Sequence, residues 1–190
     1  MDKTLAKQSY HFDTGRPVLA ILGGSQGSTP FNRHFQNHFE QYTKSNIQLL
    51  WQCGKNDFSE LKDLNRHQDI NIFPFTEDMD IFYSAADLIV SRAGALALSE
   101  MALLGKAMVL IPLPHSAGDH QNTNAITFSQ TGGAILVHQT SLDLGSLEQA
   151  VLGLIQNPHK IAIMEEISKN NGIPNATEKI TAIIMDIAES

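Results

Sequence analysis

The sequence predicts an α/β fold in which a parallel β-sheet of about six strands is covered by helices on both faces. Two observations support this prediction: short, nearly continuous runs of Val, Ile and Leu recur along the chain, and longer amphipathic segments separate them. This alternation is typical of βαβ units, and parallel strands buried on both faces are apolar throughout. We therefore expect a doubly wound, Rossmann-like sheet followed by a helical C-terminal tail.

The order of elements follows from these runs. Strands are expected at Val18–Leu22, Ile47–Gln52, Ile70–Phe73, Leu88–Val90, Ala107–Ile111 and Ala134–Val137. Helices are expected at Pro30–Tyr42, Phe58–Arg66, Asp78–Ala85, Leu96–Leu104, Asp119–Gln130, Leu147–Gln156, Pro158–Lys169 and Ala176–Ala188. Pro30 suits a first helical position, and Gly105 suits the residue after a helix end. Residues 1–16 are expected to form a loosely structured extension or linker, and residues 17–190 a single domain.

Composition excludes several classes of function. The chain has 190 residues and a formal charge of −7, and its 13 Lys and Arg are scattered rather than clustered, so no nucleic acid partner is expected. No apolar run approaches the roughly 18 residues of a membrane span, and the polar N-terminus lacks a signal-peptide core. With Cys53 as the only cysteine, an internal disulfide is impossible, which agrees with a cytoplasmic location. An anionic ligand must therefore be held mainly by helix N-termini and backbone amides.

The first expected strand leads directly into Gly23-Gly24-Ser25-Gln26-Gly27-Ser28 and then a helix. A glycine-rich turn at this point is where doubly wound sheets bind phosphate, because glycines let the backbone approach the ligand closely. Ser25 and Gln26 add hydrogen-bond donors. The alternative is that the glycines form a tight turn only.

Two further strand-to-helix junctions carry polar or small residues. Ser91-Arg92-Ala93-Gly94-Ala95 opens a helix whose Glu100 is placed to accept hydrogen bonds from a ribose, or is simply a favourable acid in a first turn. The segment from Pro112 to Asn124 is rich in groups that bind hydroxylated ligands. Because all three junctions lie at the carboxyl ends of parallel strands, they are expected to form one ligand site.

Residues of these loops are also compatible with two other kinds of chemistry. His115, Asp119 and His120 invite a metal interpretation, but two His and one Asp in a loop are more typical of hydrogen bonding, so no metal or cofactor is expected. The glycine loop also spells G-x-S-x-G, the nucleophile elbow of serine hydrolases, with Ser25, Asp87 and His115 or His120 as a nominal triad. The elbow would follow several strands in that fold, whereas here it follows the first.

The motifs GGSQG, SRAGALALSE and IPLPHSAGDHQNTNA, in this order and spacing, closely resemble the C-terminal domain of the MurG family. These are inverting UDP-N-acetylglucosamine (UDP-GlcNAc) transferases of glycosyltransferase family 28 and GT-B fold, which convert lipid I to lipid II in peptidoglycan synthesis. The resemblance runs from about Pro17 to the end of the chain. It implies that residues 17–190 form the UDP-sugar donor-binding half of a GT-B enzyme.

The resemblance also implies a donor site, with no cofactor or metal. The diphosphate would meet Gly24, Ser25, Gln26 and Gly27 together with Ala95, Leu96 and Ala97. Phe75 and the Thr76 backbone would meet the uracil, with Met79 nearby, and Glu100 would bind the ribose. His120, Gln121 and Asn124 would face the sugar, and Arg92 is a further substrate-binding residue. The family commonly has Thr where this chain has Ala97. The missing hydroxyl is expected to weaken donor binding by roughly 1 kcal/mol unless backbone amides compensate.

The family's acceptor-binding N-terminal domain, which carries the proposed catalytic base, has no counterpart in this sequence. Catalytic residues are therefore not assigned within the chain, and we expect donor binding without efficient transfer by this chain alone. The implied partners are UDP-GlcNAc, an N-terminal acceptor-binding domain or subunit, and a lipid-linked acceptor reached through that domain. The implied location is cytoplasmic and peripheral on the inner face of the cell membrane. A nucleotide-sugar-binding subunit of another glycosyltransferase remains an alternative.

Overall fold

A computed structural model describes residues 1–24, 26–114 and 116–188, and it contains the predicted sheet. Six parallel strands lie in the order β3-β2-β1-β4-β5-β6. This is the classic order of a doubly wound sheet, in which the direction of winding reverses between β1 and β4. The strands are β1 (Val18–Leu22), β2 (Gln48–Gln52), β3 (Ile70–Phe73), β4 (Leu88–Ser91), β5 (Met108–Leu110) and β6 (Ala134–Leu136).

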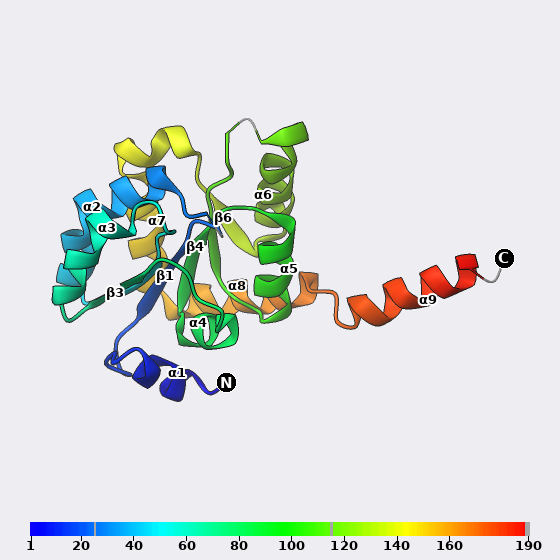
Figure 1. Ribbon diagram of the computed structural model, residues 1–190, viewed down its shortest axis with the longest axis horizontal. Coiled ribbons are helices and arrows are strands. Elements are labelled where there is room, and N and C mark those ends of the chain that lie inside the picture. The colour runs from blue at the N-terminus through cyan, green and yellow to red at the C-terminus, as the bar shows by residue number, and fades with distance from the viewer. Residues whose placement is uncertain (25, 115, 189–190) are drawn as a thin grey trace.

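Helices cover both faces of the sheet (Figure 1). They are α1 (Lys3–Ser9), α2 (Thr29–Lys44), α3 (Phe58–Leu61), α4 (Met79–Ala85), α5 (Ala95–Leu103), α6 (His120–Thr131), α7 (Ser146–Ile155), α8 (Pro158–Asn171) and α9 (Ala176–Ala188), with 3-10 turns η1 (Lys62–Arg66), η2 (Ala117–Asp119) and η3 (Gln139–Leu144). The predicted elements are confirmed to within one or two residues at most ends. The predicted helix Phe58–Arg66 divides into α3 and η1, and η3 was not predicted.

Alternate residues of each strand enter two separate cores. Leu19, Ile21 and Trp51 pack with Phe35 of α2 and Val151 of α7. On the opposite face, residues such as Ala20, Leu50 and Ile89 pack with α1, α4, α5 and α6. Because both faces are covered, the strands are apolar at successive positions, and this explains why they were recognisable in the sequence.

The expectation of a loosely structured N-terminus is wrong. Residues Lys3–Ser9 form α1, capped by Asp2, whose carboxylate accepts a hydrogen bond from the backbone N–H of Leu5 at 3.1 Å. Ala6 and Phe12 are buried. The Lys7 ammonium, also buried, lies 2.7 Å from Asp87 and donates to the Arg16 carbonyl. These tertiary contacts stabilise a helix that is too short to be stable through propensity alone.

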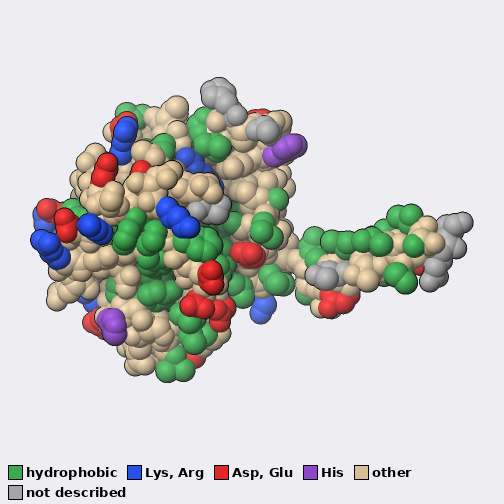
Figure 2. All heavy atoms as spheres, in the orientation of Figure 1, with side chains coloured by type: hydrophobic (Ala, Val, Ile, Leu, Met, Phe, Trp, Pro, Cys, Tyr) green, Lys and Arg blue, Asp and Glu red, His purple; other side chains and the backbone are tan. Residues whose placement is uncertain are grey.

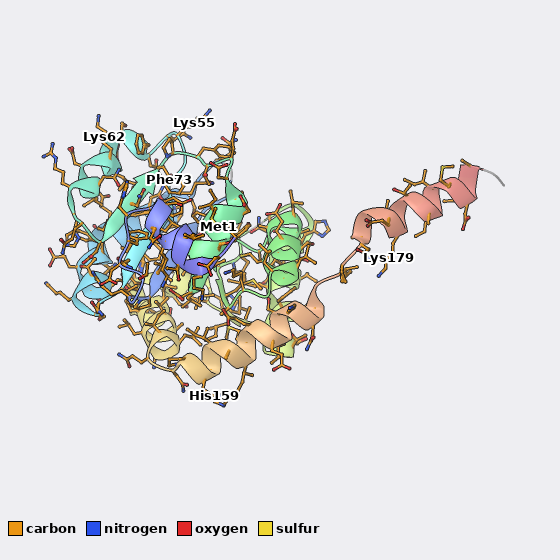
Figure 3. The ribbon with its side chains drawn as sticks, turned by 90° about the horizontal axis from the view of Figure 1, so that it is seen from below. Met1, Lys55, Lys62, Phe73, His159 and Lys179 are labelled. Carbon is orange, nitrogen blue, oxygen red and sulfur yellow. The ribbon has the colours of Figure 1, made fainter. Side chains whose placement is uncertain are left out.

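The helical tail has two parts with different surroundings. Leu147, Val151 and Leu154 of α7 and Met164 of α8 are buried in the first core. Beyond Gly172 the chain leaves the domain, and α9 projects away from it (Figures 1 and 3). Its apolar side chains are exposed, as the green spheres along this helix in Figure 2 show; they include Ile180, Ile183, Ile184 and Ile187. No helix in the described part of the chain is long and apolar enough to cross a membrane.

Candidate functional site

The glycine loop between β1 and α2 is packed directly against another loop backbone. Gly24 and Gly27 have φ values of +89° and +79°, and the Gly27 N–H donates to the Gly24 carbonyl at 2.9 Å. A Cβ atom at Gly27 would lie 2.1 Å from the Cys53 carbonyl oxygen, and one at Gly54 would lie 2.3 Å from that of Gln26. Both positions therefore require glycine for conformation and for space. Ser25, predicted at the centre of this loop, lies outside the described residues.

Gln52, at the carboxyl end of β2, connects two of the predicted ligand loops. Its amide nitrogen donates to the Gly24 carbonyl, and its amide oxygen accepts from the Thr76 backbone N–H, each at 3.2 Å. The side chain is buried. One carboxamide thus fixes the spacing between the predicted diphosphate loop and the loop predicted to meet the base.

Arg92 joins the remaining junctions from inside the protein. Its guanidinium donates to the carbonyls of Ile111 and Pro112, at 3.0 and 3.1 Å, and to the side chains of Ser28 and Gln139, at 2.8 and 2.7 Å. It also lies over the Phe31 ring, 4.5 Å from the centroid. Burial lowers the pKa of Arg92 to about 10, so it remains charged at neutral pH. Arg92, a predicted ligand residue, therefore connects the loops around the carboxyl ends of the strands through its hydrogen bonds.

The junction after β5 is tied to the junction after β4. Asn124 of α6 donates to the Ala93 carbonyl at 3.1 Å, and the Gln121 amide oxygen accepts from the Leu113 N–H at 3.0 Å. The exposed ring of His120 lies over Gly118, where a Cβ atom would come within 2.7 Å of Nε2. His115 lies outside the described residues.

Glu100 is oriented by a neighbour that sequence reasoning missed. The hydroxyl of Tyr83, on α4, donates to a Glu100 carboxylate oxygen at 3.0 Å. Burial, and then the charge of Glu100, raise the pKa of Tyr83, so the phenol stays protonated and keeps this hydrogen bond. Nearby in the chain, before and at the start of α4, Phe75 is 46% exposed and Met79 half-buried.

The junctions surround a pocket of about 520 Å³ at the carboxyl ends of β1 and β4. Six of the predicted site residues line it: Gly24, Gln26, Gly27, Arg92, Ala97 and Gln121. Its other lining residues are Gly23, Ser28, Thr29, Pro30, Ser91, Gly94, Leu113 and Gln139. Ala95, Glu100 and Asn124 instead line a separate cavity of about 440 Å³ between α5, α6 and the start of the tail. Phe75, Thr76, Met79, Leu96 and His120 line neither.

The pocket is suited to an anion. The N-terminus of α5, with Gly94 as its cap and Ala97 in its first turn, and that of α2, after Ser28, both open onto it. Helix N-termini carry unpaired N–H groups and a partial positive charge, which together bind phosphate. Among the described lining residues Arg92 alone is cationic, and its charge is already shared with protein acceptors. Backbone amides are thus the main groups that the pocket offers to an anion.

The serine hydrolase interpretation is not supported. The Asp87 carboxylate accepts from the Val18 N–H, at the amino end of β1, at 2.8 Å. His120 begins α6 after the carboxyl end of β5, so the two residues lie at opposite ends of the sheet. They cannot share a triad, and Ser25 and His115 lie outside the described residues.

Sequence reasoning missed Gln139 and Gln52, and it named Ser28 only as part of the glycine turn. Gln139 follows β6, so the rule that ligand residues follow strand ends would have found it. Gln52 looked like an ordinary strand end, because its role depends on two loops distant in sequence.

The fold is a Rossmann-like α/β domain of the kind that forms one half of GT-B glycosyltransferases. Residues 18–180 match the family model described as the glycosyltransferase family 28 C-terminal domain. The chain therefore belongs to this family, as its three motifs had indicated.

Similar proteins agree with this assignment. The chain is 34% identical over 184 residues to the UDP-N-acetylglucosamine–N-acetylmuramyl-(pentapeptide) pyrophosphoryl-undecaprenol N-acetylglucosamine transferase of Flavobacterium psychrophilum, covering 95% of the chain and 49% of that protein. It is 36% identical to the enzyme of the same name from Cytophaga hutchinsonii, covering 91% of the chain and 46% of that protein. The crystal structure of Acinetobacter baumannii MurG superposes with a TM-score of 0.75 at 29% identity, covering 90% of the chain and 52% of that structure. The chain spans about half the length of these relatives.

Proposed function

We propose that this chain is the donor-binding half of a MurG-type transferase and binds UDP-GlcNAc at the carboxyl ends of β1 and β4. The pocket there, bounded by the glycine loop and two helix N-termini, is the observation that carries the proposal. The diphosphate would lie against Gly24, Gln26 and Gly27 and the first turn of α5. Family membership and the relatives' names support UDP-GlcNAc as the donor.

The uracil, the ribose and the sugar of the donor would lie partly beyond this pocket. The exposed Phe75, with the Thr76 backbone and Met79, would meet the uracil, and Glu100, held by Tyr83, would bind the ribose hydroxyls. His120, Gln121 and Asn124 would face the GlcNAc moiety. Because several of these groups lie outside the pocket of the free protein, the donor would extend from it along α5.

In the reaction, an acceptor hydroxyl would attack the anomeric carbon with inversion, and the bond from that carbon to UDP would break. Negative charge grows on the departing diphosphate, so amides at Gly24–Gly27 and Ala95–Ala97 would stabilise the transition state more than the ground state. The base that accepts the hydroxyl proton would come from an acceptor-binding domain or subunit. That partner would also hold a lipid-linked acceptor and place the assembly on the inner membrane surface.

Calorimetric titration tests the donor assignment. We expect the chain to bind UDP-GlcNAc in preference to UDP-glucose, UDP-galactose and GDP-mannose. Glu100→Gln and Gln121→Leu should each weaken binding by about tenfold, as expected for lost hydrogen bonds to a bound ligand. Glu60→Gln, on the exposed surface of α3, serves as the matched control and should bind like the parent chain.

Addition of a separately expressed MurG-type acceptor domain tests the transferase role. Donor binding followed by GlcNAc transfer in the mixture supports the full proposal. Donor binding with no transfer would favour a nucleotide-sugar-binding role, and preference for another sugar would reassign the chain to a different transferase. Absence of binding to every nucleotide sugar, alone and in the mixture, would overturn the proposal.

A further inference from the structure

Three potential metal ligands meet between α2 and α7, on the face of the sheet covered by the first core. His34 and His38 are one turn apart on α2, and Glu148 comes from α7. Nε2 of His34 lies 3.0 Å from Oε1 of Glu148, and Nδ1 of His38 lies 3.7 Å from the same oxygen. One ligand atom from each residue falls within 4.8 Å of the others.

Two of the three residues are buried and lack hydrogen-bond partners for their polar atoms. His34 is 4% exposed and Glu148 is 8% exposed. Both ring nitrogens of His34 and both carboxylate oxygens of Glu148 have no hydrogen-bond partner in the described part of the chain. The 3.0 Å approach of His34 to Glu148 therefore lacks the angles of a hydrogen bond. Buried polar groups without partners are costly, and a bound ion would give these atoms a partner.

The chemical types of the three ligand groups indicate which metal ion the cluster would bind. Zn²⁺ binds His nitrogen and carboxylate oxygen at about 2.0–2.2 Å, so two tetrahedral ligands lie about 3.3 Å apart. The two distances to Oε1 of Glu148 bracket that value. Mg²⁺ and Ca²⁺ prefer sets made of oxygen alone.

We propose that His34, His38 and Glu148 form a binding site for a zinc-like divalent transition metal that links α2 to α7. The His38 side chain is 31% exposed, which leaves a solvent-facing position for a water as fourth ligand. Nδ1 of His38 also lies 2.8 Å from the His34 carbonyl, and this contact would be exchanged for the metal. Because the ligands join the middle of α2 to α7, the ion's role is structural. The site is independent of the donor pocket.

Titration of the chelator-treated chain with Zn²⁺ and Co²⁺ tests this site. We expect saturable binding of one ion per chain, an increase in Tm, and visible Co²⁺ absorption of the intensity typical of tetrahedral sites. Mg²⁺ and Ca²⁺ should not compete. His38→Gln should weaken Zn²⁺ binding by at least about tenfold.

The control is His159→Gln, an exposed His at the start of α8 (Figure 3), which should bind Zn²⁺ like the parent. Glu148→Gln should also weaken binding, and His38→Gln keeps the test valid if substitutions at the buried positions prevent folding. Absence of saturable Zn²⁺ binding would overturn the proposal. Equal Zn²⁺ affinity in His38→Gln and the parent chain would do the same.

Discussion

The two ends of the sheet use buried polar groups in different ways. At the amino end, Asp87 accepts from the Val18 N–H at 2.8 Å and pairs with Lys3 and Lys7, at 2.9 and 2.7 Å. At the carboxyl end, Arg92 has no carboxylate partner among the described residues and donates instead to carbonyls, a hydroxyl and an amide. Opposite charges are therefore paired at one end, whereas at the other a single positive charge is distributed over neutral acceptors.

The amino end is therefore held together by ion pairs, and the carboxyl end by hydrogen bonds to loop backbones. Ion pairs at the amino end hold α1 against the domain. At the carboxyl end, hydrogen bonds from Arg92 and Gln52 fix loop backbones while helix N-termini remain available around the pocket. Preorganised amides are the requirement for binding a diphosphate without a cluster of basic side chains. Substitutions at the two ends should therefore have distinguishable effects on stability and on ligand binding.

The largest effect is expected from Arg92→Met. The substitution leaves the Ile111 and Pro112 carbonyls without their buried donor and should lower the free energy of unfolding by about 3 kcal/mol. UDP-sugar binding should be lost with the loop geometry. Urea denaturation and calorimetry measure the two effects. Arg66→Met, at an exposed position of η1, should change stability by less than about 0.5 kcal/mol. Equal stabilities of the two variants would contradict the inference that the hydrogen bonds of Arg92 hold the loops together.

The second-largest effect is expected at the amino end of the sheet, where Asp87 makes the stability of the fold depend on acid pH. Burial acts to raise the pKa of Asp87, but Lys7, the Val18 N–H and Lys3 outweigh it, and the net shift is downward. Asp87 therefore stabilises the fold above its unfolded-state pKa of about 3.9, and this contribution disappears as pH falls through the lower folded-state value. Asp87→Asn should lose about 2 kcal/mol near neutral pH.

Urea midpoints measured from neutral pH down to acid pH test this account. The parent chain should lose stability relative to Asp87→Asn as Asp87 becomes protonated. Donor binding near neutral pH should be nearly the same in both, since Asp87 lies far from the pocket end. Parallel pH profiles for the two chains would rule out this contribution from Asp87.

The smallest and most specific comparison uses two glutamines of β2. Gln52 connects Gly24 and Thr76, whereas Gln48, at the other end of the strand, exchanges two hydrogen bonds with the Asp13 backbone. Both are buried. Gln52→Leu and Gln48→Leu should each cost about 1 kcal/mol of stability. Only Gln52→Leu should also weaken UDP-GlcNAc binding, by about fivefold. Equal affinities would show that the Gln52 bridge does not organise the site.

The sequence predicted those elements whose structure is determined by the residues of a single segment. Strands such as Val18–Leu22 were recognisable because burial on both faces requires continuous apolar residues. Gly24 and Gly27 were recognisable from the strand that precedes them. In contrast, α1 depends on the Lys7–Asp87 contact, and the orientation of Glu100 depends on Tyr83. The His34, His38 and Glu148 cluster requires two helices to come together, so neither segment alone indicates it.

The projecting helix α9 has a thermodynamic consequence. A helix of 13 residues is marginally stable in water unless its apolar face is buried, and the described side chains of α9 are exposed. A surface that covered its isoleucines would therefore stabilise the helix by burying apolar area, and part of that free energy would offset the entropy lost when the helix is ordered. The affinity of such a contact would be lower than its buried area suggests. Helix-favouring substitutions on the polar side of α9 would raise this affinity without adding a contact.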